Sequence, residues 1–115
     1  MKKMLTILAV SVFMVAACSK TTTNNPEPGD CNGTAKSFAA DVSPVIQSSC
    51  AIGSGCHGSG SQNGPGVLAN YSQVSSARTA IRSAIISGRM PVNGSLSAAQ
   101  KNAIICWIDN GAPNN

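Results

Sequence analysis

Two cysteines and the only histidine of the chain lie close together, in the run Cys50-Ala-Ile-Gly-Ser-Gly-Cys56-His57. A histidine directly after the second of two nearby cysteines is typical of C-x-x-C-H, the motif that attaches c-type haem. In such motifs both thiols bond to the vinyl groups of haem, and the histidine is the proximal ligand of the iron. The spacing here is the longer C-x5-C-H, so residues 52–54 or their neighbours must bulge outward, which two glycines in the run permit. The run therefore predicts covalent attachment of one haem through Cys50 and Cys56, with His57 on the iron.

The same residues allow other interpretations, which the sequence leaves open. Cys50 and Cys56 can form a plain disulfide across a glycine-rich loop, and His57 is then an ordinary surface residue. A structural zinc site built from these three residues and one further cysteine has enough ligands, although in an exported protein such thiols tend to oxidise. Blue copper is excluded because it needs two histidines. The adjacency of Cys56 and His57 also argues against a cysteine nucleophile activated by that histidine.

Met90 is a candidate for the second axial ligand of the iron. The three other methionines belong to an amino-terminal segment that is expected to be removed, so the mature chain keeps one methionine and one histidine, Met90 and His57. Met90 lies in the run Gly-Arg-Met-Pro at 88–91, between two predicted helices and on no apolar helix stripe. His/Met ligation raises the reduction potential of haem iron. The alternative is that Met90 fills space beneath a turn.

The amino terminus predicts export and lipid anchoring. Lys2 and Lys3 precede an uncharged apolar run, 4–17, which is too short to span a bilayer and fits the hydrophobic region of a signal peptide. The Val-Ala-Ala-Cys ending at Cys18 resembles a bacterial lipobox, in which cleavage precedes the cysteine and that cysteine carries the lipid. We therefore expect a signal peptide over 1–17 and a mature protein anchored by Cys18 to a bacterial membrane, on its periplasmic face or at the cell surface. An ordinary signal peptide with an incidental cysteine is the alternative.

The segment 18–30 predicts a flexible, lipid-anchored tether, because it is rich in Thr, Asn, Pro and Gly and has no large apolar residue. The folded part is then 31–115, a single domain. Only 3% of the chain is aromatic, so the core of this domain is thin. Small domains of this kind usually need disulfides, a metal or a cofactor. The basic residues form no run and are not interleaved with aromatics, which excludes a nucleic-acid-binding surface.

Three helices with long connections are predicted in this domain. The first covers 37–50, and its regular part begins with Ser43 as N-cap and a proline at the first helical position. The second begins near 72–75 and ends at Gly88. The third begins at Ser97, which forms a capping box with the glutamine three residues later, and a Gly-x-Pro sequence ends it.

Several strings in the chain resemble one family over nearly all of 31–112: Phe-Ala-Ala-Asp-Val-Ser-Pro-Val-Ile-Gln at 38–47, Cys56-His57, Arg-Met-Pro at 89–91, Leu96-Ser97 and Cys-Trp-Ile-Asp-Asn-Gly-Ala at 106–112. The family is that of the small lipoprotein c-type cytochromes of Bacteroidetes and planctomycete-type bacteria. Its members usually have C-x4-C-H or C-x2-C-H as the haem motif, and this chain has one residue more than the longer form.

The resemblance implies an all-α, class I cytochrome c-like domain, in which about three helices and long loops wrap around one haem and the first and last helices cross. Trp107 is then expected in the core at that crossing. With Cys50 and Cys56 on haem, Cys31 and Cys106 are left to form a disulfide, which stabilises the fold by about 3–4 kcal/mol in the chain-entropy treatment. The implied function is that of an electron carrier, not an enzyme, between exported redox proteins. The alternative function is a haem-free, disulfide-stapled surface lipoprotein that binds a partner.

Overall fold

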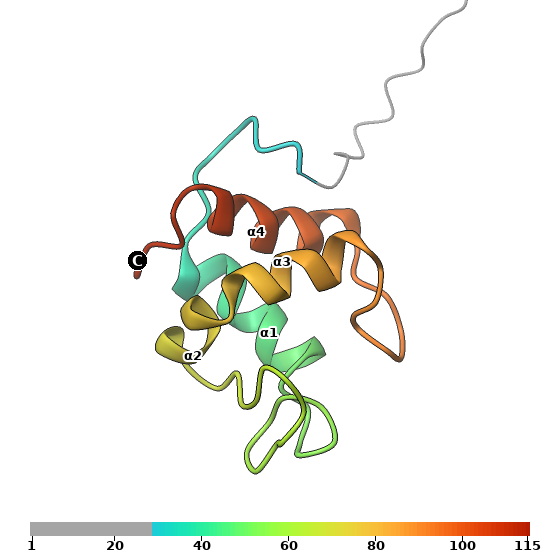
Figure 1. Cartoon of the computed structure of the whole chain (residues 1–115). Helices are drawn as coiled ribbons and strands as arrows, with labels where there is room; N and C mark the ends of the chain where they lie inside the picture. Colours follow the sequence, from blue (N-terminus) through green and yellow to red (C-terminus); the bar gives the residue numbers. More distant parts are fainter. Residues whose placement is uncertain (1–28) are drawn as a thin grey trace, which may run out of the picture.

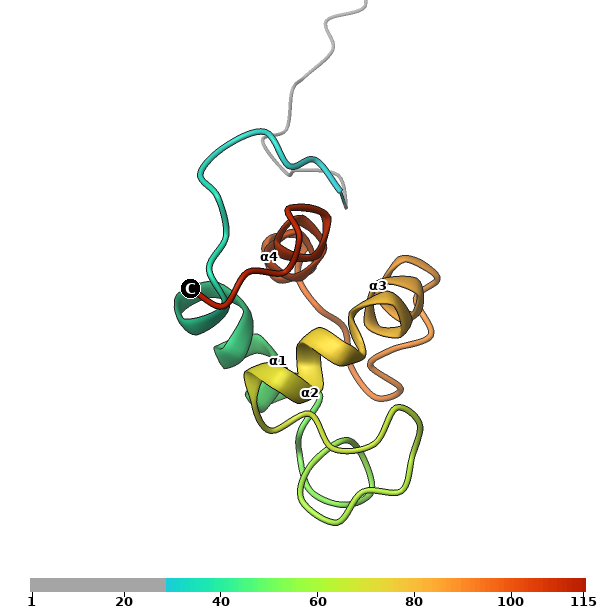
Figure 2. The ribbon, with the colours of Figure 1, turned by 60° about the vertical axis from the view of Figure 1, so that its left-hand side comes forward.

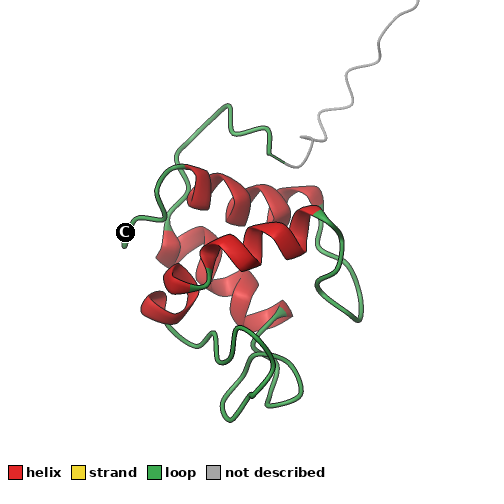
Figure 3. Ribbon diagram, in the orientation of Figure 1, coloured by secondary structure: helices red, strands yellow, loops and turns green. Residues whose placement is uncertain are grey.

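The computed structural model describes residues 29–115, which form an all-α arrangement with no strand in this range (Figures 1 and 3). In chain order the elements are a π-helical turn, η1 (Phe38–Val42), and the helices α1 (Ser43–Ser49), α2 (Tyr71–Ser76), α3 (Arg78–Ile86) and α4 (Ala98–Asp109). The prediction of an all-α fold is confirmed for these residues. The predicted signal peptide (1–17), the lipidated Cys18 and the tether as far as residue 28 lie outside the described residues. Within 29–115, no helix has the length and apolar character needed to cross a bilayer.

The first helical segment begins earlier than its proline suggests. Ser37 is the N-cap of η1, and its hydroxyl accepts a hydrogen bond from the Ala40 amide at 3.0 Å. The Val42 amide donates to the Ser37 carbonyl five residues back, the π-helical pattern, and α1 follows without interruption. Ser43 is therefore not an N-cap, and that prediction is wrong. The turn before it already supplies helical backbone, so α1 needs no new cap and its proline lies in the first turn.

The second predicted helix is two helices. Asn70 caps α2 through its side-chain oxygen, which accepts from the Gln73 amide at 3.0 Å. The backbone departs from helical geometry at Ala77 (φ −90°, ψ 1°), where α3 begins. Val74 before this break and Ile81 after it are both buried, so each short helix presents its own apolar side to the core. A single straight helix was expected because the apolar spacing continues across the break.

The last helix, α4, is the element that the sequence predicts most closely. The Ser97 hydroxyl accepts from the Gln100 amide at 3.2 Å, and the Gln100 side chain accepts from the Ser97 amide at 2.9 Å. This reciprocal capping box is the predicted one. Gly111 follows the helix with a φ of +92°, a left-handed conformation that favours glycine.

Three aromatic side chains from three elements form the centre of the core. Trp107 of α4 is fully buried, and its ring centroid lies 5.5 Å from that of Phe38 in η1 and 6.3 Å from that of Tyr71 in α2. The indole N–H donates to the Pro113 carbonyl at 2.8 Å, and the Tyr71 hydroxyl donates to the Ala112 carbonyl at 2.9 Å. The few aromatics of the domain are thus concentrated at the contact between the first and last helical segments, where Trp107 was expected.

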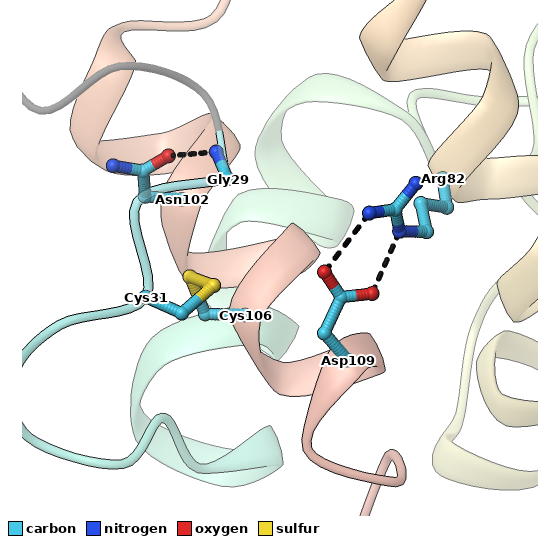
Figure 4. A network of polar contacts seen from close by, with 6 residues as sticks. All are labelled: Gly29, Cys31, Arg82, Asn102, Cys106 and Asp109. Carbon is cyan, nitrogen blue, oxygen red and sulfur yellow. Dashed lines mark hydrogen bonds and ion pairs between the residues drawn. A yellow bond between two sulfur atoms is a disulfide. The ribbon is translucent and has the colours of Figure 1, made fainter.

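The chain before η1 is fastened to α4 (Figure 4). Cys31 and Cys106 form a disulfide with their Cα atoms 5.3 Å apart, as the family resemblance implied. One helical turn earlier on α4, the side-chain oxygen of Asn102 accepts a hydrogen bond from the Gly29 amide at 2.9 Å. The start of the described chain is therefore held on α4, at the opposite end of the molecule from the loop between α1 and α2 (Figures 1 and 2).

A second link joins α3 to α4. The guanidinium of Arg82 donates to both carboxylate oxygens of Asp109, at 2.7 and 2.9 Å (Figure 4). Hydrogen bonding to the guanidinium lowers the pKa of the Asp109 carboxyl and raises the pKa of Arg82. The pair is solvent-exposed, so water and salt screen it.

Candidate functional site

The cysteine and histidine run begins where α1 ends. Cys50 is the C-cap of α1, and its amide donates to the Ile46 carbonyl at 2.9 Å. The chain then leaves the helices and returns to α2 through the loop 51–69, which projects from the helices in both orientations of the ribbon (Figures 1 and 2). The end of α1 thus fixes the position of Cys50, whereas the positions of Cys56 and His57 depend on the conformation of the loop.

His57 is buried, although it lies in the middle of this loop. Its side chain and backbone are only 7% exposed. The His57 amide donates to the Cys50 carbonyl at 2.9 Å, and the His57 carbonyl accepts from the amide of the buried Leu68 at 2.8 Å. The interpretation of His57 as an ordinary surface residue is therefore wrong.

The imidazole of His57 is oriented by a second hydrogen bond, between Nδ1 and the Gly66 carbonyl oxygen at 2.9 Å. A carbonyl oxygen only accepts, so Nδ1 carries the proton. In the neutral ring Nε2 then has a free lone pair. A backbone carbonyl on one ring nitrogen and an available lone pair on the other is the usual arrangement of a metal-ligating histidine.

Polar side chains hold the loop around His57 in shape. The Ser61 hydroxyl donates a short hydrogen bond to the Cys56 carbonyl. The side-chain amide of Asn63 donates to the Gly55 carbonyl at 2.9 Å, and the Asn63 backbone amide donates to Ser61 Oγ at 3.2 Å. Each of these bonds satisfies a backbone group that a loop would otherwise leave unpaired, so the segment around His57 is internally ordered.

Both cysteines of the run are free thiols in the structure, so the plain disulfide between them is not formed here. Cys50 is half-buried and packs against the hydrophobic core, whereas Cys56 is exposed. Burial raises the pKa of the Cys50 thiol, and the nearby Cys56 raises it further, since two thiolates would repel each other. The two thiols therefore lie at different depths beneath the surface.

Met90 lies on another segment, the connection 87–97 between α3 and α4. It is half-buried, and its amide donates to the Ala84 carbonyl at 3.2 Å. Two exposed apolar side chains flank it along the chain, Ile86 at 52% and Val92 at 75% exposure. In the described residues no hydrogen bond joins this connection to the loop 51–69. The structure thus brings Cys50, Cys56 and His57 together, whereas Met90 is presented by a separate loop.

The rest of the described chain offers no second candidate for a metal site. No group of three or more His, Cys, Asp or Glu side chains is placed to hold a metal ion within 29–115. A recess of about 240 Å³ lies beside the disulfide, away from His57, and is lined by residues such as Asn32, Lys36 and Asn102. The pairing of Cys31 with Cys106 also removes the further cysteine that a zinc site at Cys50 and Cys56 would require.

Several contributors to the site were missed in the sequence. The Gly66 carbonyl, Ser61 and Asn63 carry no signal of their own, because each acts through a backbone contact that depends on the path of the loop. The Gly-Pro-Gly run at 64–66 is a recognisable turn signal, and it marks the place where the loop turns back toward His57.

Comparisons of the chain with protein-family models, with curated proteins and with solved structures give no match.

Proposed function

We propose that this chain is a membrane-anchored monohaem c-type cytochrome, which carries single electrons between exported redox partners. The observation that carries the proposal is the state of His57, a buried imidazole whose Nδ1 is bonded to the Gly66 carbonyl. Nε2 has no hydrogen-bond partner in the described residues and is not buried, so it is open to a ligand although the residue as a whole is buried. As an axial ligand of haem iron, Nε2 uses that lone pair.

The other donors fit the same cofactor. Cys50 and Cys56 are free thiols at two depths beside His57, and they attach haem c covalently. Met90, on the connection between α3 and α4, would be the second residue that holds the haem iron. A thioether and an imidazole suit low-spin haem iron, whereas a zinc or calcium site would need more nitrogen, thiolate or oxygen donors than this part of the chain brings together.

The chain residues account for electron transfer without catalysis. Bound haem supplies a reversible one-electron couple. His57 and Met90 would hold the haem iron in both oxidation states, so the residues around it would rearrange little when the electron moves. The proposed fold is that of a class I cytochrome c, and the packing of η1 against α4 through Phe38 and Trp107 supports it.

The proposed location follows from the amino terminus. Export by the signal peptide and lipid on Cys18 hold the protein at a bacterial membrane, and the segment that follows tethers the domain. The fastening of Gly29 and Cys31 to α4, away from the loop that contains His57, supports a tether that enters the domain at that end.

The full chain, exported from cells that carry the haem-maturation proteins, tests the proposal. We expect a coloured protein with a reversible one-electron reduction and the sharp visible bands of low-spin haem. His57→Ala is the decisive variant, and it should lose the low-spin bands. Ser59→Ala, an exposed position in the same loop, is the matched control and should keep them. A colourless protein from the unaltered chain contradicts the proposal and favours the haem-free, disulfide-stapled lipoprotein.

A further inference from the structure

We infer that Gly53 and Gly58 form a backbone closure that extrudes the extra residues of the C-x5-C-H run, so that Cys50 reaches its haem vinyl group despite the long spacing. Gly58 is thus a positioning residue for the attachment of Cys50. The inference rests on the proposed function, because it concerns how the proposed haem is attached.

The backbone hydrogen bond between His57 and Cys50 is the one that a shorter, helical motif would form. In an α-helix each amide donates to the carbonyl four residues earlier. A helical C-x-x-C-H run would therefore join the amide of its histidine to the carbonyl of its first cysteine. In this chain His57 follows Cys50 by seven residues, and yet its amide donates to the Cys50 carbonyl at 2.9 Å. The backbone thus gives His57 the same relation to Cys50 that the short spacing would give, with three residues removed from the path.

Hydrogen bonds to the Gly53 carbonyl close the loop behind the residues that bulge outward. Gly53 has a φ of +86°, which favours glycine, and its carbonyl accepts from the Cys56 amide at 3.2 Å and from the Gly58 amide at 2.8 Å. The side chain of Ile52 is 60% exposed, and residues 53–55 are exposed as well. The extra residues of the long spacing therefore project into solvent, as the sequence predicted. The hydrogen bond between the His57 amide and the Cys50 carbonyl is kept.

The backbone of Gly53 and Ala51 lies so close to Gly58 that no side chain fits there. A Cβ atom at this position would lie 2.5 Å from the Gly53 nitrogen, 2.7 Å from the Gly53 Cα and 2.8 Å from the Ala51 carbonyl oxygen. These are backbone atoms, which cannot move aside without opening the closure. By contrast, a Cβ at Gly55 would meet nothing within 4 Å, and the φ of Gly55 is not in the left-handed region. Gly58 is therefore required by the closure, and Gly55 is not.

The chemistry that depends on this geometry is an addition. Each thiol adds its sulfur to one carbon of a vinyl group and its proton to the other carbon, so a C–S and a C–H bond replace an S–H bond and the π bond. No oxidant, reductant or leaving group is needed. Cys56, next to His57, reaches one vinyl group through adjacency alone, whereas Cys50 depends on the closure to reach the other.

The test counts attachment at each cysteine separately. The full chain, exported with haem-maturation proteins, is denatured without reduction and alkylated, and peptides carrying Cys50 and Cys56 are mapped by mass. Haem on both cysteines, with neither alkylated, is the expected result. Haem on Cys56 with Cys50 alkylated overturns the inference and leaves the proposed function standing. Alkylation of both cysteines, or a disulfide between them, overturns both.

Two variants test the closure itself. Gly58→Ala should raise alkylation of Cys50 several-fold with little change at Cys56, and Gly55→Ala is the matched control that should change neither. Deletion of residues 52–54 removes Gly53 and restores the short spacing, so it should keep full attachment and should rescue Cys50 attachment when combined with Gly58→Ala. The visible absorption of the denatured holoprotein, which shifts with each vinyl group that remains, reads the same outcome independently. Equal attachment in Gly58→Ala and Gly55→Ala, or equal loss at both cysteines in Gly58→Ala, would overturn the positioning role.

Discussion

The imidazole Nδ1 of His57 lies 2.9 Å from the carbonyl oxygen of Gly66, nine residues further along the chain. This contact fixes both the ring orientation and the position of its proton, and it leaves Nε2 as the free nitrogen. A hydrogen bond to the second ring nitrogen affects how strongly a histidine binds a metal. The conformation of the loop at Gly66 therefore affects how strongly His57 would bind the proposed haem iron.

Gly66→Ala should weaken the proposed His57 ligand without removing it. Gly66 has a φ of +94°, so a side chain strains the backbone there and moves the carbonyl away from Nδ1. His57 then leaves the iron more easily, and the low-spin bands should be lost at a lower temperature on heating. Loss of such contacts typically weakens metal binding by about 10–100-fold. Gly60→Ala is the control, since Gly60 also has a positive φ (+81°) in the same loop but makes no hydrogen bond to His57. Identical loss of the bands on heating in the two variants would show that the Gly66 carbonyl does not support the ligand.

Met90→Ala should lower the reduction potential and open the sixth position of the iron, because methionine ligation raises the potential of haem. Added imidazole or cyanide should then bind rapidly and change the visible spectrum. Val92→Ala is the matched control, because Val92 belongs to the same connection and is 75% exposed. If Met90→Ala keeps the original potential and spectrum, Met90 is not the ligand.

Removing the disulfide should destabilise the domain strongly. Cys31 and Cys106 are separated by 75 residues, and closing a loop of that length contributes about 4 kcal/mol in the chain-entropy treatment. The double variant Cys31→Ala with Cys106→Ala should therefore unfold about 20 °C lower, as measured by circular dichroism. Thr34→Ala, an exposed position on the same segment, should leave the midpoint unchanged. A midpoint within a few degrees of the unaltered chain would mean that the contacts of η1 with α4 suffice without the disulfide.

The ion pair between Arg82 and Asp109 predicts a specific pH dependence. Its guanidinium lowers the pKa of the folded Asp109 carboxyl, so the pair contributes to stability above the ordinary aspartate pKa of about 3.9. That contribution is lost as the pH falls through the lower pKa of the folded state. Unfolding midpoints of the unaltered chain and of Asp109→Asn should therefore differ slightly at neutral pH and converge at acid pH. A constant difference across this range would contradict the assignment of the pair.

The sequence predicts the elements of this fold better than their junctions. The capping box of Ser97 forms as expected because it depends only on residues within one helical turn. The break at Ala77 is not visible in the sequence, since the apolar spacing runs through it, and tertiary packing of Val74 and Ile81 decides it. The same holds for Ser43, where a local N-cap signal is overridden by a helical turn that starts at Ser37.

The candidate site likewise has residues that the sequence identifies and contacts that only the folded loop creates. Cys50, Cys56 and His57 are recognisable because the motif is local, and residue types alone indicate the chemistry. The Gly66 carbonyl and the Gly53–Gly58 closure are not, because they depend on how the loop 51–69 folds back on itself. A backbone carbonyl can belong to any residue, so no sequence pattern identifies it in advance.

The most direct test of the proposed cytochrome is the intact mass of the exported full chain after denaturation, measured with and without reduction. We expect the mass of the lipidated chain from Cys18 onward plus one haem that survives denaturation, and a change on reduction that corresponds to a single disulfide, Cys31 with Cys106. The mass of the chain without haem, with a change on reduction that corresponds to two disulfides, would contradict it.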